Sequence, residues 1–379
     1  MRLAIRILLS AIAAISATFS APSMAQQAGT LVSADPILEA PGGMQAWRVS
    51  YWTRTADNRP RMVTGMVVAP REAQPVRPRG IIAWAHGTSG VVERCGLSSR
   101  GDFFTVTPAL TEMIMNGYTV AAPDYPGLGS GGAHPYLVGP DTANSVLDAV
   151  RAARMIPGAY AGSRFAVWGE SQGGHAALWT GIRARSYAPE LTMVGIAAAA
   201  PPTELIANLR QGSEANIRAM MTAFTAYSWS QHYGATLSTL GRKPTQDLIS
   251  RLARNNCIEL GKDPKLSTVI GILALRNALK KVDFGGRVPW SGYARSNSVN
   301  PALVPGPVLI VQSLKDPIVA PAVTRDFARK LCQHGRALRW IDLPGGDHAH
   351  SARDSSGATL DWIAARFAGE RPPNECRRL

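Results

Sequence analysis

The sequence predicts an α/β fold, with a mostly parallel sheet, helices on both of its faces and an inserted helical cap. Short, wholly apolar runs that stop at Gly-rich or polar loops alternate with helical segments, as strands and helices do in doubly wound folds. One interval of about a hundred residues, from near Ala200 to near Val308, contains helical segments but no strand of matching strength. The 379 residues are 46% hydrophobic and 17% charged, which excludes a disordered chain and allows one large core or two modest ones.

The first 25 residues are expected to form a cleaved secretory signal. Arg2 and Arg6 precede an apolar stretch over residues 7–15, and residues 23–25 fit an A-x-A-like peptidase site. A membrane anchor is the alternative, but the apolar stretch is shorter than the roughly 20 residues that a bilayer requires. The mature protein is therefore expected to be secreted or periplasmic.

Eight segments are predicted to be strands. The first two are joined by a polar turn and form an expected hairpin, the next five are short apolar runs typical of buried parallel strands, and the eighth is a last strand. In chain order they are residues 47–52, 62–68, 80–85, 119–122, 165–168, 193–200, 308–312 and 338–343.

Six segments show helical periodicity. They are residues 108–116, 141–155 and 173–185 between strands, and residues 203–227, 245–257 and 267–281 in the long interval. We therefore predict an α/β domain made of residues 26–201 and 301–379, with residues 202–300 inserted as a helical cap or lid.

Four cysteines, Cys95, Cys257, Cys332 and Cys376, would reach an oxidising compartment after export. Two disulfides are favoured over free thiols, and the sequence does not choose among the three possible pairings. No pair has C-x-x-C spacing, so a zinc site is not expected.

The formal charge of +14 raises the question of nucleic-acid binding. The Arg and Lys residues are scattered singly and no nucleic-acid motif accompanies them, so no nucleic-acid partner is expected. Loss of Arg2 and Arg6 with the signal would leave +12. This surplus favours peripheral contact with an anionic membrane surface or envelope polymer, through an attraction that salt screens.

Gly169-Glu170-Ser171-Gln172-Gly173 is the only G-x-S-x-G in the chain. It lies directly between an apolar strand and a helix rich in Ala and Leu, which is the setting of a nucleophile elbow. Side chains at Gly169 and Gly173 would collide with neighbouring backbone in such a turn. We predict Ser171 as the nucleophile and the backbone N–H of Gln172 as an oxyanion donor. The alternative is an ordinary Gly-rich turn with an incidental serine.

A serine nucleophile needs a base and a carboxylate that orients the base. Asp316 lies in the loop after residues 308–312, and its alternative role is to cap the helix that begins near Pro321. His348 lies in the loop after residues 338–343. The chain order of serine, aspartate and histidine is that of α/β-hydrolases.

Two neighbours of His348 are alternatives in this loop. A G-x-x-H step from Gly345 favours His348 over His350 as the base. Asp347 is the alternative orienting acid to Asp316.

Thr88, in the loop His86-Gly87-Thr88-Ser89, is the candidate for a second oxyanion donor, through its backbone N–H and its hydroxyl. The competing interpretation is a structural loop in which Gly87 only makes the turn. A G-x-G-x-x-G at residues 127–132 is not interpreted as a dinucleotide site, because Ala133-His134-Pro135 separates it from any helix. No metal or organic cofactor is implied.

The sequence resembles the secretory lipase family of α/β-hydrolases, to which Candida antarctica lipase A belongs. The resemblance rests on HGTSG at residues 86–90, APDYPGLG at residues 122–129, residues 141–154, the elbow and the two later loops. It covers most of residues 40–370 and includes a helical cap before the acid-bearing loop. It implies an α/β-hydrolase fold and two disulfides, Cys95 with Cys257 and Cys332 with Cys376.

The expected function is that of an exported serine hydrolase that cleaves carboxylic esters of lipids or other small molecules through an acyl-enzyme. The alternatives are an acyltransferase with the same acyl-enzyme, a peptidase, and a non-catalytic ligand-binding protein on a hydrolase scaffold. Six cap residues supply surface suited to acyl chains, or else form the cap's own core. They are Ile217, Met220, Met221, Phe224, Tyr227 and Trp229.

Overall fold

The structure is a computed structural model and describes residues 26–379, except residues 73, 260 and 346. The expected signal, residues 1–25, lies outside the described residues. None of the described helices is both long and apolar enough to cross a bilayer.

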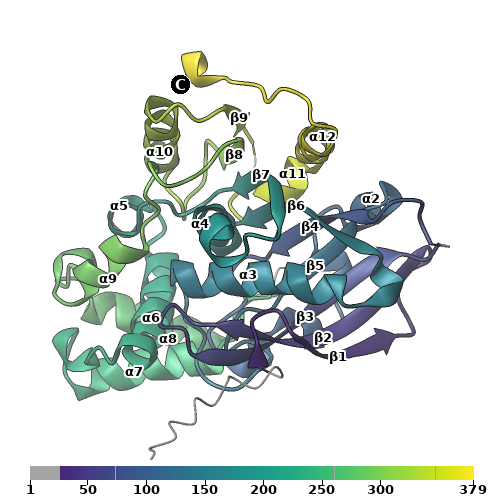
Figure 1. Cartoon of the computed structure of the whole chain (residues 1–379). Helices are drawn as coiled ribbons and strands as arrows, with labels where there is room; N and C mark the ends of the chain where they lie inside the picture. The colour runs from purple at the N-terminus through teal and green to yellow at the C-terminus, as the bar shows by residue number, and fades with distance from the viewer. Residues whose placement is uncertain (1–25, 73, 260, 346) are drawn as a thin grey trace, which may run out of the picture.

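One nine-stranded sheet, with the strand order β1-β2-β3-β5-β4-β6-β7-β8-β9, forms the centre of the molecule (Figure 1). The first three strands and β5 pair antiparallel, whereas β5, β4, β6, β7, β8 and β9 run parallel. The strands are β1 (Leu31–Ile37), β2 (Met44–Arg54), β3 (Pro60–Pro70), β4 (Arg79–Ala85), β5 (Thr119–Pro123), β6 (Ala161–Glu170), β7 (Thr192–Ala199), β8 (Val308–Ser313) and β9 (Leu338–Leu343). The mostly parallel α/β-hydrolase sheet predicted from the sequence is confirmed.

The predicted hairpin is β2 and β3, and the structure adds an antiparallel edge strand, β1, that the sequence did not predict. Strand β1 contains Pro36 and is only partly buried, so it lacks the continuous apolar pattern of the central strands. An edge strand tolerates a proline because one side of its backbone needs no partner.

Alternate residues of the central strands enter two separate cores, because side chains point to opposite faces along a strand. Ile81 belongs to the core beneath α3, α4 and α10, and Ile82 to the core beneath α2 and α12. The sheet is therefore covered on both faces. The helices of this domain are α1 (Phe103–Val106), α2 (Leu110–Met115), α3 (Gly139–Arg154), α4 (Gln172–Tyr187), α10 (Pro321–Gln333), α11 (Ser351–Asp354) and α12 (Ser356–Phe367).

Five helices are inserted between β7 and β8 and lie beside one end of the sheet, as the cap region at the lower left of Figure 1. They pack around a third core that includes Phe224, Trp229 and Trp290. They are α5 (Leu205–Gln211), α6 (Ala215–Tyr233), α7 (Lys243–Asn255), α8 (Leu266–Ala278) and α9 (Trp290–Asn297).

The helix expected over residues 203–227 is divided into α5 and α6 at Gly212. The backbone N–H groups of Ser213 and Glu214 leave the helical direction and donate to the carbonyl oxygen of Pro317, at 3.0 and 3.2 Å. The break therefore has a tertiary cause, a contact between the cap and the loop after β8. Helix α9 was also not predicted.

Two disulfides join distant parts of the described chain. Cys95, in the loop after β4, is bonded to Cys257, just after α7, and Cys332 at the end of α10 is bonded to Cys376 near the C-terminus. These are the pairings that the resemblance implies. The first ties the cap to the α/β domain, and the second holds the C-terminal tail against α10.

Replacing Cys332 and Cys376 together with serine is expected to lower the free energy of unfolding by about 2–4 kcal/mol, since the bond closes a long loop in the unfolded chain. Urea unfolding of the mature protein, followed by tryptophan fluorescence, measures the change. Wild-type protein unfolded under the same non-reducing conditions is the reference, so that the Cys95–Cys257 bond is intact in both proteins. An unchanged unfolding midpoint in the double variant would contradict a stabilising role for this bond.

Candidate active site

Ser171 occupies a strained turn between β6 and α4. Its φ of 55° and ψ of −120° are rare for a residue with a side chain. A Cβ at Gly173 would lie 1.8 Å from the carbonyl oxygen of Ala85, and one at Gly169 would lie 2.1 Å from that of Gly173. Only glycine fits at these two positions, as the sequence predicted, and the half-buried serine is thereby raised above the end of the sheet.

His348 connects Ser171 to Asp316. Its Nε2 lies 2.8 Å from Oγ of Ser171, and its Nδ1 lies 2.7 Å from Oδ2 of Asp316. With the proton on Nδ1, the histidine donates to the carboxylate, and Nε2 is left free to accept from the serine hydroxyl.

Asp316 is held by its own loop. Its Oδ1 accepts from the backbone N–H groups of Ile318 and Val319, both at 2.9 Å, and its Oδ2 accepts from Nε2 of Gln312 at 3.1 Å. The alternative role as a cap for α10 does not fit, because that helix begins after Ala320 and no side chain caps it. The carboxylate oxygens instead face the loop and the histidine.

The two alternatives in the histidine loop pair with each other. Nδ1 of His350 lies 2.8 Å from Oδ1 of Asp347, and this pair is partly exposed. The structure therefore brings His348, and not His350, into contact with Ser171.

The charges around His348 favour its protonated form. Burial alone would lower its pKa, but the hydrogen bond and charge of Asp316 outweigh burial and raise the pKa above its ordinary value. Glu170 is buried beside it, and burial raises the pKa of this carboxyl to about 7, although its Oε1 accepts from the backbone N–H of Ala352 at 2.7 Å. Glu170 thereby joins the serine turn to α11, which follows the histidine loop.

The two predicted oxyanion donors border the serine. A Cβ at Gly87 would lie 3.8 Å from Cβ of Ser171, so the loop that carries Thr88 passes beside the nucleophile. Gln172 opens α4, where backbone N–H groups have no partner within the helix. Its side-chain Nε2 lies 2.6 Å from Nε2 of His134, whose Nδ1 donates to the carbonyl oxygen of Pro126 at 3.0 Å. The segments that carry the two predicted donors therefore lie next to Ser171.

Other residues near the site have structural roles. Asp124 accepts from the hydroxyl of Thr64 at 2.6 Å and from the backbone N–H of Ser98 at 2.8 Å. His86 is buried, and its carbonyl oxygen accepts from the hydroxyl of Tyr125 at 3.0 Å. The Gly-rich residues 127–132 form turns and bends and open no helix, as expected.

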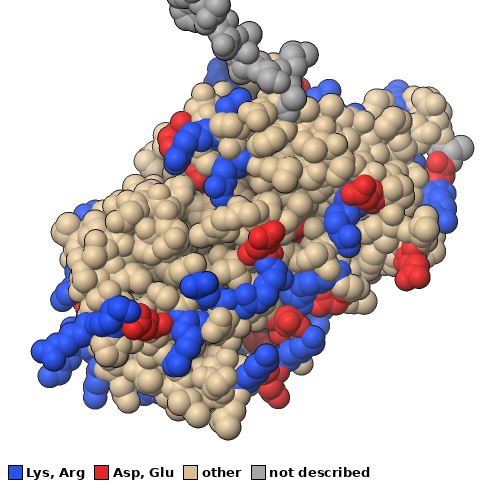
Figure 2. Space-filling model, turned by 90° about the horizontal axis from the view of Figure 1, so that it is seen from below, with Lys and Arg blue, Asp and Glu red and all other residues tan. Residues whose placement is uncertain are grey.

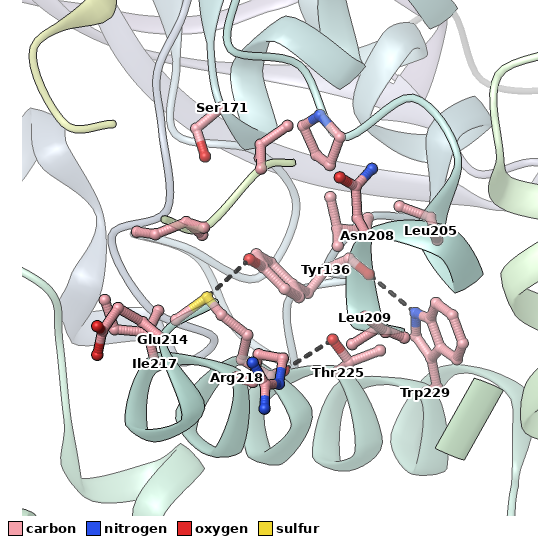
Figure 3. A pocket seen from close by; sticks show the side chains of 15 residues that line it. Tyr136, Ser171, Leu205, Asn208, Leu209, Glu214, Ile217, Arg218, Thr225 and Trp229 are labelled. Atoms are coloured by element: carbon pink, nitrogen blue, oxygen red, sulfur yellow. Dashed lines mark hydrogen bonds between the residues drawn. The ribbon is translucent and has the colours of Figure 1, made fainter. Parts of the chain in front are cut away.

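A largely apolar cavity opens beside Ser171, with an empty volume of about 680 Å³ that includes the open mouth. Figure 3 shows Ser171 at one side, Tyr136 in the middle and residues of α6 along the opposite wall. The lining residues are Tyr136, Leu137, Ser171, Pro202, Leu205, Asn208, Leu209, Glu214, Ile217, Arg218, Met221, Thr225, Trp229, Ile318 and Val319. Of the six cap residues named from the sequence, Ile217, Met221 and Trp229 line the cavity, while Met220 and Phe224 are buried in the cap core.

Tyr136 is a site residue that the sequence did not indicate. Its hydroxyl lies 2.9 Å from Oγ1 of Thr88 and donates to Sδ of Met221 at 3.4 Å, so it joins the loop that carries Thr88 to the cap. No local motif marks it, because its neighbours come from segments far away in the chain. Gln312 was also missed, although its place at the end of a strand before Asp316 is a usable signal.

No group of three or more His, Cys, Asp or Glu side chains that could hold a metal occurs among the described residues.

Comparisons with known proteins agree with this architecture. Residues 97–234 match the family model described as secretory lipase. The structure aligns with the closed state of Candida antarctica lipase A at a TM-score of 0.75 and 19% identity, over 93% of this chain and 85% of that chain. That alignment shows a shared fold.

Two curated relatives cover most of the chain. A secreted triacylglycerol lipase of Malassezia globosa is 24% identical over 358 residues, which is 88% of this chain and 75% of the relative. A probable inactive lipase of Mycobacterium tuberculosis is 22% identical over 359 residues, which is 87% of this chain and 75% of the relative. With the family-model match over residues 97–234, these similarities show that the chain has an α/β-hydrolase fold and is similar to secretory lipases.

Proposed function

We propose that the protein is an exported serine hydrolase that cleaves carboxylic esters through an acyl-enzyme. The observation that carries this proposal is the continuous hydrogen-bonded contact from Ser171 through His348 to Asp316. One relative is named as probably inactive, but all three side chains are present and in contact here. Their arrangement supports an active enzyme over a ligand-binding scaffold.

In the first step, Oγ of Ser171 attacks the acyl carbonyl carbon while Nε2 of His348 accepts the serine proton. Asp316 orients the imidazole and stabilises its positive charge. The backbone N–H groups of Gln172 and Thr88 donate to the oxyanion, and the Thr88 hydroxyl is oriented by Tyr136. The tetrahedral intermediate collapses when His348 returns the proton to the leaving alcohol.

In the second step, water attacks the acyl-enzyme. His348 accepts a proton from the water, the same donors stabilise the second oxyanion, and collapse returns the proton to Ser171. The products are a carboxylic acid and an alcohol, and the free enzyme is restored. If another alcohol replaces water, the same step becomes acyl transfer.

The cavity supports acyl esters as substrates. Its walls are mainly aliphatic and aromatic, and its charged lining residues are Glu214 and Arg218. An acyl chain in such a cavity would be removed from water while its ester group lies beside Ser171. We assign the lid role to the region of residues 202–300, which supplies most of this lining, and assign residues 26–201 and 301–379 to the catalytic domain.

Export is supported by the two disulfides and by the secreted relative. We therefore propose that residues 1–25 direct the protein to the periplasm or out of the cell. The cationic surplus would favour contact with anionic lipid there.

Ser171→Ala is expected to abolish hydrolysis of p-nitrophenyl esters, with a loss of at least about 10³-fold in kcat, because no other group can form the acyl-enzyme. A series from acetate to palmitate measures the chain-length profile of the wild type and the variant. Equal activity of the two proteins contradicts the proposal. Transfer of the acyl group to an added alcohol, with little free acid, would indicate acyltransferase activity instead.

His348→Ala and His350→Ala form a matched pair two positions apart. Only the first should lose hydrolysis, by at least about 10³-fold, since His350 contacts Asp347 and not Ser171. Steady-state rates on the ester found best in the series provide the measurement. A comparable loss in both variants would indicate that hydrolysis depends on the structure of the loop and not on the imidazole of His348.

The acid limb of the pH profile of kcat/KM should have its midpoint above the ordinary histidine value of 6.5, because the pKa of His348 is raised and only its neutral form can accept the serine proton. Activity should therefore be lost as the pH falls through this raised pKa of His348. Asp316→Asn is expected to move the midpoint to lower pH and to reduce kcat by about 10³–10⁴-fold.

A pH profile of Glu170→Gln separates the two groups that titrate near neutrality. If His348 controls the limb, the midpoint remains close to that of the wild type. If the limb disappears in Glu170→Gln, the titration belongs to Glu170, whose pKa of about 7 lies in the same range.

A further inference from the structure

Helix α8 is apolar on both its inner and its outer face. Thr268, Gly271 and Leu275 are buried on the inner face, which packs against α6 and α7. On the outer face, Leu266, Ile270 and Leu273 are 74%, 59% and 44% exposed. The spacing of these three residues places them on one line along the helix, which we call the outer row.

An outer row of this kind is unusual on a water-soluble surface. A helix that is apolar all round is normally buried, and a surface helix normally has a polar outer face. Single exposed apolar residues need no explanation, whereas a contiguous row marks a surface that binds something. Val269, 36% exposed, widens the row on one side.

The surroundings of the row are strongly cationic. Within residues 242–281 there are nine Lys and Arg side chains and three acidic ones, and α8 itself contains no carboxylate. The cationic residues are Arg242, Lys243, Arg251, Arg254, Lys262, Lys265, Arg276, Lys280 and Lys281. Two of the three acids, Asp247 and Glu259, are paired with Lys243 and Lys262, so most of the other cations lack an acidic neighbour in this segment.

Lysines flank the row at both ends. Lys265 immediately precedes α8, and Lys280 and Lys281 follow it, all of them exposed. In the view from below, toward the side on which α7 and α8 lie in Figure 1, Lys and Arg gather in the lower half of the surface with fewer acidic side chains between them (Figure 2).

We propose that the outer row of α8 and the lysines around it form a docking surface for an anionic lipid bilayer. An amphipathic helix lying in the plane of a bilayer inserts its apolar residues below the headgroups, while Lys and Arg reach the anionic groups above. The combination on α8 fits this geometry, since the row supplies insertion and the lysines supply attraction to anionic headgroups. A second copy of the chain would bring a like-charged surface to the row, since the protein carries a surplus of cations, whereas an anionic bilayer complements this charge.

The position of α8 gives this docking a consequence for the active site. Helix α8 packs against α6, and α6 carries cavity residues on another of its faces. Nη1 of Arg276 donates to Oδ1 of Asn216 at 3.3 Å, one residue before Ile217, which lines the cavity. A bilayer bound at α8 would therefore lie close to the wall of the cavity. That such docking would deliver lipid esters to the active site rests on the proposed function. Binding of α8 to a bilayer does not depend on that function.

The test uses the full mature chain with Ser171→Ala, so that vesicles are not degraded. Binding is measured by co-sedimentation with vesicles of phosphatidylcholine alone and of phosphatidylcholine mixed with phosphatidylglycerol. We expect binding to the anionic vesicles that weakens as salt is raised. Ile270→Ser with Leu273→Ser should lower the partition constant at least tenfold, because two inserted side chains are lost.

Two matched controls accompany these variants. Met115→Ser with Leu303→Ser removes apolar residues that are 80% and 58% exposed elsewhere, and should leave binding unchanged. Lys265→Gln, Lys280→Gln and Lys281→Gln together should remove the preference for anionic vesicles, whereas Arg185→Gln with Arg377→Gln should keep it. Hydrolysis of a soluble acetate ester by the outer-row variant, with Ser171 restored, should equal that of the wild type, which separates docking from catalysis.

Several results would overturn the proposal. One is that the outer-row variant binds anionic vesicles as tightly as its parent. Another is that the control variants lose as much affinity as the outer-row variant. A third is that vesicles of phosphatidylcholine alone bind the protein as well as anionic vesicles do. A change from dimer to monomer in the outer-row variant, with vesicle binding unaffected, would assign the row to contact between two copies of the chain.

Discussion

The start of α4 lies so close to the end of β4 that no side chain fits between them. At Gly173 even a methyl group would overlap the carbonyl oxygen of Ala85. This closeness obliges the chain to turn within one residue, and Ser171 takes the unfavourable backbone angles that result. The backbone N–H of Ser171 donates to the carbonyl oxygen of Ala199 at 2.8 Å, which anchors the turn to β7. The exposed hydroxyl of the serine, and every contact described around it, depends on this close approach.

Parallel pairing of the strands brings the remaining groups to the same edge. Glu170 at the end of β6 is paired with Ala199 of β7, Ala199 is paired with Val311 of β8, and Ser313 of β8 is paired with Leu343 of β9. Loops that leave these strands therefore begin at nearly the same height. Asp316 and His348, distant in the chain from Ser171, reach it without long excursions.

The sequence predicted features that depend on residues close together in the chain, and missed features that depend on contacts between distant segments. The central strands were predictable because they are buried on both faces and so are mostly apolar. Ser171 was predicted from its G-x-S-x-G motif, and Asp316 and His348 from chain order and loop position; the structure brings these three together. Strand β1 was missed because an edge strand needs no continuous apolar run, and the break at Gly212 because its cause is a distant carbonyl group. Helical periodicity predicted α8, but only packing against α6 and α7 reveals which of its two apolar faces is left outside.

The bond between Cys95 and Cys257 constrains how the cap can move. An inserted segment that is joined to the rest of the protein only at its two ends can rotate as a rigid body about the axis through those ends. A third covalent attachment limits such a rotation, and here the attachment joins the end of α7 to the loop after β4. Rotation of the cap as one rigid body is therefore restricted while this bond is intact. A rearrangement confined to the inserted helices, by contrast, leaves this attachment in place.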